Sequence, residues 1–175
     1  MSYIIVCGTN RKNSVSKIIS GLYQNLLLEK GIKADIIDLA ELPVDFTESA
    51  LYENSGKNDE FNIYRKKMLE AKKYVFIVPE YNGSFPGVLK AFIDGLQFPN
   101  TFPDKKCALI GVSSGVQGGG LALSHLTDIF NYCGMNVLAL KPKLSRIEEN
   151  MTGDEIRNPL YQELLEQQVE KLIGY

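Results

Sequence analysis

Residues 8–16 carry several hydroxyl and basic side chains just ahead of a predicted helix. Thr9, Ser14 and Ser16 supply the hydroxyls, and Arg11 supplies a guanidinium. Free backbone N–H groups and the positive end of a helix dipole form an anion site at such a position, and arginine binds phosphate oxygens bidentately. The segment has neither the Gly-Lys-Ser/Thr of a P-loop nor a Gly-x-Gly-x-x-Gly turn. It therefore suits a terminal phosphate, and the alternative is an ordinary helix cap.

Two further loops have unusual compositions. Residues 79–87 read Pro-Glu-Tyr-Asn-Gly-Ser-Phe-Pro-Gly, a turn that presents Tyr81 and Asn82 as a wall for one side of a flat heterocycle. Residues 111–120 read Gly-Val-Ser-Ser-Gly-Val-Gln-Gly-Gly-Gly, and so many glycines let the backbone approach a ligand closely. Each loop alone is also compatible with a tight connection. Together, at one end of a sheet, the three loops favour a binding site.

Short apolar runs bounded by turn residues alternate with segments of helical period. The predicted strands are Tyr3–Cys7, Ala34–Asp38, Tyr74–Pro79, Ala108–Ser113 and Asn136–Leu140. The predicted helices are Ser14–Lys30, Asp59–Lys72, Pro86–Leu96, Gly120–Cys133 and Glu155–Ile173. This alternation predicts an α/β fold, a flavodoxin-like three-layer α/β/α sandwich with a five-stranded parallel sheet in the order 2-1-3-4-5. Residues 42–57 are expected to form a long polar connection without regular structure.

The composition narrows the class of protein. With 175 residues, 45% of them hydrophobic and 23% charged, we expect one globular domain over residues 1–175. A net charge of −2 argues against nucleic-acid binding. Three distant cysteines indicate reduced thiols in the cytoplasm. The first residues do not resemble a signal peptide, and the longest uncharged stretch, residues 107–127, is too rich in glycine and polar residues for a membrane span.

The sequence also bears on other functions, namely hydrolysis, metal binding and electron transfer. Gly111–Gly115 has the Gly-x-Ser-x-Gly pattern of a hydrolase nucleophile, but no acidic residue lies between Ser113 and His125, as the order of a hydrolase triad requires. One histidine and scattered cysteines give no ligand pair at zinc spacing. A flavodoxin-like electron carrier or flavin-binding module stays open as the alternative, although such carriers usually have a strongly acidic surface.

The three loops together resemble the NADPH-dependent FMN reductase family, which comprises flavodoxin-like quinone, azo-dye and chromate reductases. The first loop is similar to the family's Gly-Ser-x-Arg-x-x-Ser-x-Asn pattern, with Thr9 in place of the frequent Ser and Ser16 in place of the common Asn. Residues 79–94 are similar to its most specific signature, and residues 111–119 are similar to its glycine-rich third loop. The matches extend from residue 4 to about residue 140.

The resemblance implies an FMN-dependent oxidoreductase that passes a hydride from NADPH (or NADH) to a small electron acceptor, with no catalytic acid or base demanded of the protein. The implied cofactor-binding residues are Thr9, Arg11, Ser14, Val15, Ser16, Pro79, Glu80, Tyr81, Asn82, Gly83, Ser113, Ser114, Gly115, Gln117 and Gly118. It also implies a homodimer or homotetramer. Lys90 and Asp94, one helical turn apart, serve either that subunit contact or a solvated intrahelical pair.

Overall fold

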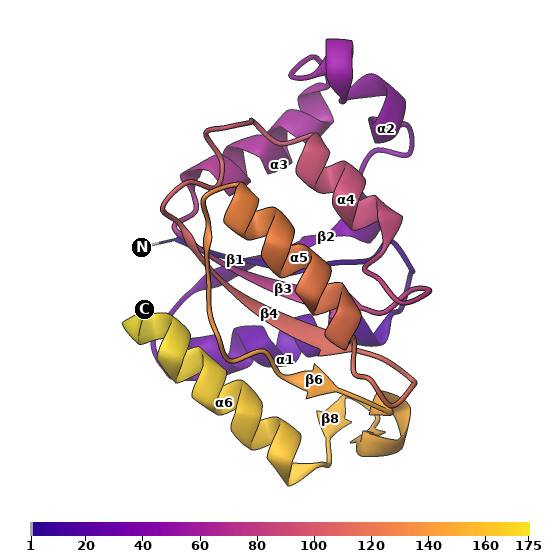
Figure 1. Ribbon diagram of the computed structural model, residues 1–175, viewed down its shortest axis with the longest axis vertical. Helices are drawn as coiled ribbons and strands as arrows, with labels where there is room; N and C mark the ends of the chain where they lie inside the picture. Colours follow the sequence, from indigo (N-terminus) through magenta and orange to yellow (C-terminus); the bar gives the residue numbers. More distant parts are fainter. Residues whose placement is uncertain (1) are drawn as a thin grey trace.

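The computed structural model describes residues 2–175, and its central sheet is parallel (Figure 1). The four long strands are β1 (Tyr3–Cys7), β2 (Ala34–Asp38), β3 (Lys73–Pro79) and β4 (Lys106–Val112). With β5 at Asn136–Val137, the strands follow the order β2-β1-β3-β4-β5, which confirms the predicted flavodoxin-like order. The first two strands end where the sequence predicts, and the next two are within two residues of the prediction. Buried runs of this kind are typical of central parallel strands.

The fifth strand is shorter than predicted and is split in two. β5 (Asn136–Val137) pairs with the start of β4, and β6 (Lys143–Leu144) pairs with its end, so the sheet has six strands. Between them, the buried Gln168 amide donates hydrogen bonds to the carbonyls of Leu109 (3.0 Å) and Leu140 (2.8 Å). A side chain thus replaces main-chain pairing in the middle of this edge, which is why a continuous strand over 136–140 is wrong.

Helices cover both faces of the sheet (Figure 1). One face carries α3 (Asp59–Glu70), α4 (Gly87–Asp94) and α5 (Gly120–Tyr132), and the other carries α1 (Val15–Glu29) and α6 (Pro159–Gly174). Successive strand residues face opposite layers, so Ile4 joins the first core and Ile5 the second. The result is the expected three-layer arrangement.

Residues 42–57 contradict the prediction of a structureless connection. They contain α2 (Phe46–Ser49) and a one-turn 3-10 helix at Tyr52–Asn54. Phe46 and Leu51 are buried, and the ring of Phe46 stacks on that of Phe61 with centroids 5.5 Å apart. Isolated apolar residues in a polar sequence give no periodic signal, although they anchor this segment over the first core.

The C-terminal helix begins later than predicted. A two-stranded hairpin, β7 (Met151–Thr152) and β8 (Glu155–Ile156), occupies the start of the predicted helix. α6 then starts at Pro159, behind an Asn158 cap whose side chain accepts from the Leu160 N–H. Proline in the first turn and asparagine at the cap are typical start signals. A further 3-10 turn covers Ile147–Asn150, and another covers Leu39–Glu41.

The topology brings three loops to one edge of the sheet. β1, β3 and β4 are adjacent and parallel, with Cys7 opposite Ile77 and Pro79 opposite Val112. The loops that follow these strands therefore leave from the same edge, where open α/β sheets bind ligands. Among residues 2–175, no helix has the length and apolarity needed to cross a membrane.

Candidate functional site

The first loop ends at the N-terminus of α1. The Ser14 hydroxyl caps this helix by accepting from the Lys17 N–H at 3.2 Å. The first backbone N–H groups of a helix have no partner within the helix, so they point toward the loop together with the positive end of the dipole. Arg11 and Asn13 are exposed beside them, and Asn13 has a left-handed backbone (φ 54°). This end of the loop is suited to an anion.

Thr9 connects the first loop to the second. It is completely buried, its hydroxyl shares a 2.7 Å hydrogen bond with the phenol of Tyr81, and it accepts from the Arg11 N–H at 3.2 Å. Gly8 lies so close to β3 that an added Cβ would be 2.8 Å from the carbonyl oxygen of Ile77. The loop therefore has a fixed position relative to its neighbour.

The second loop is a tight turn with two left-handed residues. Asn82 (φ 52°) and Gly83 (φ 75°) occupy its centre, and Tyr81 and Ser84 exchange backbone hydrogen bonds of 2.8 and 3.1 Å. Asn-Gly is the pair that favours a type I′ turn. The Ser84 hydroxyl also bonds Nδ1 of His125 on α5 at 2.9 Å. The turn holds Tyr81 in place at the edge of the site.

The third loop is fixed by Glu80 and Ser113. One Glu80 carboxylate oxygen accepts from the Gly119 N–H at 3.1 Å, and the Glu80 N–H donates to the Val112 carbonyl at 2.9 Å. The Ser113 hydroxyl donates to the Gly115 carbonyl at 2.9 Å and accepts from the Gly118 N–H at 3.0 Å. Its hydrogen bonds are thus used inside the loop, and His125 bonds Ser84 instead. Ser113 and His125 therefore do not form the nucleophile–base pair of a hydrolase.

The glycines of the third loop permit a close approach of backbones. An added Cβ on Gly111 would lie 2.1 Å from the Gly118 carbonyl oxygen, and one on Gly118 would lie 2.7 Å from the Cβ of Lys143. Gly118 and Gly119 are also left-handed, with φ of 59° and 77°. Side chains at these positions would push the loop away from β4 and β6.

The three loops enclose one hollow of about 150 Å³. Most of the predicted site residues line it, namely Thr9, Arg11, Ser14, Val15, Ser16, Pro79, Glu80, Tyr81, Ser113 and Ser114. The other predicted residues, Asn82, Gly83, Gly115, Gln117 and Gly118, are not among its lining. Asn82 and Gly83 lie at the tip of the second loop, Gly115 and Gln117 are exposed on the third, and Gly118 is buried against Lys143.

The hollow also has a wall that the sequence analysis missed. Asn13, Val112, Ile147 and Glu148 line it together with the predicted residues. Asn13 and Val112 are immediate neighbours of the predicted segments. Ile147 and Glu148 come from the stretch after β6, which carries no motif, and only the pairing of β6 with the end of β4 brings them here.

The thiol nearest the first loop is not a reactive group. Cys7 is fully buried at the end of β1, with Sγ 3.9 Å from the Ser14 hydroxyl. Burial, and then the negative charge of Asp38, raise the pKa of this thiol, which therefore stays protonated near neutral pH. Within residues 2–175 no group of three or more His, Cys, Asp or Glu side chains is arranged to hold a metal ion. The site offers hydrogen bonds and charge rather than a nucleophile.

The sequence model of the NADPH-dependent FMN reductase family matches residues 1–142 of this chain. The chain belongs to this family. The matched region contains all three loops of the hollow, which confirms the family that the loop motifs indicate. Ile147 and Glu148 lie beyond it.

Relatives of known name agree with this assignment. A NAD(P)H:quinone oxidoreductase of Solanum tuberosum is 32% identical over 71% of this chain and 64% of its own length. An FMN-dependent NADPH-azoreductase of Staphylococcus saprophyticus is 31% identical over 72% of this chain and 67% of its own length. The chain thus spans just under two thirds of the plant relative.

Among solved structures, a flavoenzyme NAD(P)H:(acceptor) oxidoreductase of Paracoccus denitrificans superimposes with a TM-score of 0.79. The match covers 99% of this chain and 95% of that one, at 20% sequence identity. At this identity the structural similarity establishes the flavodoxin-like fold of this reductase-family member. The ligand has to be inferred from the residues of the site.

Proposed function

We propose that this reductase-family chain binds FMN in the three-loop hollow and transfers a hydride from NADPH or NADH to a small acceptor such as a quinone or an azo compound. The observation that carries this proposal is the convergence of the family's three loop motifs on one hollow, joined by the Thr9–Tyr81 and Glu80–Gly119 hydrogen bonds. An identical fold with dispersed loops would not support it.

The residues of the hollow fit the parts of FMN. The N-terminus of α1, Arg11, Ser14 and Ser16 supply hydrogen-bond donors for the phosphate. Thr9 organises this loop through bonds that its buried hydroxyl already makes. Pro79, Glu80, Tyr81 and Asn82 are assigned to the ring system, and residues 113–118 to its other edge. When bound, FMN would supply the hydride chemistry between the nicotinamide and the acceptor.

The protein's own contribution is to hold the ring system of FMN in a fixed position. The Glu80 carboxylate is tied to Gly119, and the phenol of Tyr81 is tied to Thr9, so both are pre-set before any ligand binds. Rigid positioning of this kind lowers the entropy lost when reactants are brought together. Because bound FMN would carry the hydride chemistry, no side chain in the hollow is required to act as an acid or a base.

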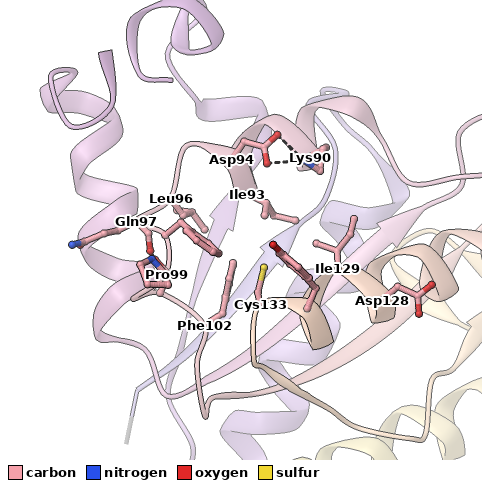
Figure 2. A pocket seen from close by; sticks show the side chains of 13 residues that line it. Lys90, Ile93, Asp94, Leu96, Gln97, Pro99, Phe102, Asp128, Ile129 and Cys133 are labelled. Carbon is pink, nitrogen blue, oxygen red and sulfur yellow. Dashed lines mark hydrogen bonds and ion pairs between the residues drawn. The ribbon is translucent and has the colours of Figure 1, made fainter. Parts of the chain in front are cut away.

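A second apolar hollow lies between α4 and α5, and we infer that it belongs to a homodimer or homotetramer interface. It measures about 430 Å³, and Ile93, Ile129 and Cys133 point into it (Figure 2). Phe98 and Tyr132 at the same hollow are 72% and 84% exposed. Large apolar side chains grouped on one surface are typical of protein contacts.

Lys90 and Asp94 form an ion pair within α4. Lys90 donates to both carboxylate oxygens of Asp94 at 2.6 and 2.7 Å, as Figure 2 shows. Light scattering after gel filtration tests the interface. We expect Tyr132→Glu to dissociate the oligomer, and we expect Leu28→Glu, which places the same charge at an exposed apolar residue of α1, to leave it intact. Equal behaviour of the two variants would contradict this interface.

The three free thiols fit the reducing cytoplasm in which we place the protein.

The visible spectrum of the purified protein tests the function directly. We expect the protein to bind FMN and the flavin absorbance to bleach when NADPH is added without oxygen, then to return when a quinone is supplied. Uptake of FMN without reduction by NADPH or NADH would favour the electron carrier or flavin module instead. Failure to bind FMN would refute the proposal.

A further inference from the structure

The segment after β6 forms a wall of the hollow, although it lies outside the matched region of the family. Ile147 and Glu148 share the hollow with Arg11 and with the residues at the start of α1. The hairpin that follows lies beside the same helix, because Asp154 at its tip shares a surface hollow with Lys17. The segment therefore flanks the N-terminal half of α1, which is the phosphate end of the site.

Main-chain hydrogen bonds fasten this segment to the third loop. The Ser113 N–H donates to the Leu144 carbonyl at 3.1 Å, and the Ile147 N–H donates to the Ser113 carbonyl at 3.1 Å. The Arg146 N–H donates to the Gly115 carbonyl at 2.9 Å. Figure 1 shows β6 beside the end of β4, which is where these contacts begin. The segment and the third loop therefore form one unit.

A polar network keeps the turn rigid behind the hollow. Arg146 has a left-handed backbone (φ 43°), a conformation that a non-glycine residue keeps only when its surroundings enforce it. Asn150 donates to the Arg146 carbonyl at 2.9 Å and accepts from Asn158 at 2.9 Å, and Tyr161 donates to the Ser145 carbonyl at 3.0 Å. Glu148 is thereby held at the hollow by a backbone that has little freedom to move away.

Glu148 and its neighbour Glu149 differ in their charge partners. Glu149 pairs with Arg146 at 3.9 Å, whereas Glu148 forms no ion pair within residues 2–175. Both side chains are exposed, but only Glu148 lines the hollow. A carboxylate without an ion-pair partner among the described residues therefore shares the hollow with the hydroxyls and the arginine that suit a phosphate.

We propose that Glu148 is a specificity-determining residue of the cofactor site, whose carboxylate opposes the phosphate of FMN. This inference rests on the proposed function, because it presupposes FMN in the hollow. Like charges within about 10 Å repel, and salt screens the repulsion over that distance. The carboxylate therefore offsets part of the attraction of the phosphate to Arg11 and to the N-terminus of α1. The affinity of the site for FMN then exceeds its affinity for riboflavin, the same molecule without phosphate, by a smaller factor.

The test compares two adjacent charge-removing variants, Glu148→Gln and Glu149→Gln, by flavin fluorescence titration with FMN and with riboflavin. At low ionic strength we expect E148Q to bind FMN about three- to tenfold more tightly than the wild type and to bind riboflavin equally well. The gain should shrink at high salt. E149Q should match the wild type with both flavins, and melting curves should show that both exposed substitutions leave the fold intact.

Each other outcome has a definite meaning. Unchanged FMN affinity of E148Q, or the same gain in E149Q, would overturn the role of Glu148 and leave the proposed function standing. Equal changes for FMN and riboflavin would also overturn it, because Glu148 would then contact the ring or the ribityl chain instead of the phosphate. A wild-type protein that binds neither flavin would refute the proposed function and this inference with it.

Discussion

The two ends of the sheet use positive charge in opposite ways. At the carboxyl ends of the strands, Arg11 is exposed beside hydroxyls and an open helix N-terminus. At the amino ends, Lys73 and Lys105 are only 6% and 9% exposed, and each is surrounded by acceptors. A cluster of cations alone therefore does not mark a ligand site. What separates the two ends is whether the hydrogen bonds of the cation are already used.

The buried lysines bind the free carbonyls at the C-termini of two helices. Lys73 donates to the carbonyls of Leu172 (2.8 Å) and Ile173 (2.9 Å) in the last turn of α6. Lys105 donates to the carbonyls of Met68 (3.1 Å) and Leu69 (2.6 Å) at the end of α3, and to the Tyr74 hydroxyl at 2.9 Å. Carbonyls at helix C-termini lack partners and carry partial negative charge. These ammonium groups serve stability, whereas we propose that the exposed Arg11 guanidinium binds the ligand.

The largest expected effect comes from Gly111→Ala, which disrupts the third loop at the carboxyl ends of the strands. The new methyl group would meet the Gly118 carbonyl at 2.1 Å, so the third loop must move away from β4. We expect a loss of about 3 kcal/mol or more in the free energy of unfolding, together with loss of FMN binding. Denaturant melts and flavin titration measure both.

The matched control is Gly87→Ala at the start of α4. An added Cβ at Gly87 has nothing within 4 Å, and its backbone is not left-handed. This variant should be as stable as the wild type or slightly more so. If G111A behaved like G87A, the close packing of the third loop would not be needed for the site.

The second prediction breaks the opposite end through Lys105→Met. Methionine fills much of the same space but leaves the carbonyls of Met68 and Leu69 and the Tyr74 hydroxyl without this donor. The Met68 carbonyl still accepts from the Tyr74 hydroxyl, so the main loss is the donor to the Leu69 carbonyl. An unsatisfied acceptor of this kind costs about 2 kcal/mol, which a denaturant melt detects. FMN affinity should be unchanged. Lys106→Met, a neighbour whose ammonium lies over the Tyr175 ring instead, should destabilise far less. Altered FMN binding in K105M would contradict the division between the two ends.

The third prediction concerns the exposed cation. Arg11→Ala removes a donor that lines the hollow and is exposed to solvent. We expect FMN binding to weaken by roughly 2 kcal/mol, or about thirtyfold in Kd, with no change in the melting temperature. Lys12→Ala, an exposed neighbour outside the hollow, serves as the control. Similar FMN affinities for R11A and K12A would mean that Arg11 is an ordinary surface residue.

Local sequence signals predict one part of this fold well. β1 and β2 have the predicted limits because each is a short apolar run bounded by turn residues. The loops after β1, β3 and β4 also meet as expected, since parallel topology alone brings them to one edge. These features depend on residues that are close in sequence or on a rule that holds for all such sheets.

The missed features depend on partners that are distant in sequence. The fifth strand is interrupted because Gln168, 59 residues after Leu109, bonds to that carbonyl from α6. Glu148 reaches the hollow because β6 pairs with β4 and because Asn150 and Asn158 fix the turn behind it. No periodicity or motif in residues 136–158 predicts these contacts, so they can be seen only in the folded chain.

The smallest expected effect is the pH dependence that Lys105 contributes to stability. Burial, and then the charge of Lys72, lower the pKa of Lys105 to about 8, against the ordinary value of 10.5. Between these two pH values the unfolded chain binds more protons at this position than the folded one, so stability from this group rises as pH increases from about 8 to 10.5. Below pH 8 both states are protonated and the contribution is constant. Other groups also titrate in this range, so the quantity to measure is the difference in melting temperature between wild type and K105M. The whole shift of the Lys105 pKa would correspond to about 3 kcal/mol, but the hydrogen bonds to Met68, Leu69 and Tyr74 favour the charged ammonium and offset part of it. We therefore expect this difference to grow by about 2–4 °C, or ~1 kcal/mol, across the window. A constant difference would show that the bonds to Met68, Leu69 and Tyr74 keep Lys105 charged in spite of its burial, and the two ends would then differ in hydrogen bonding alone.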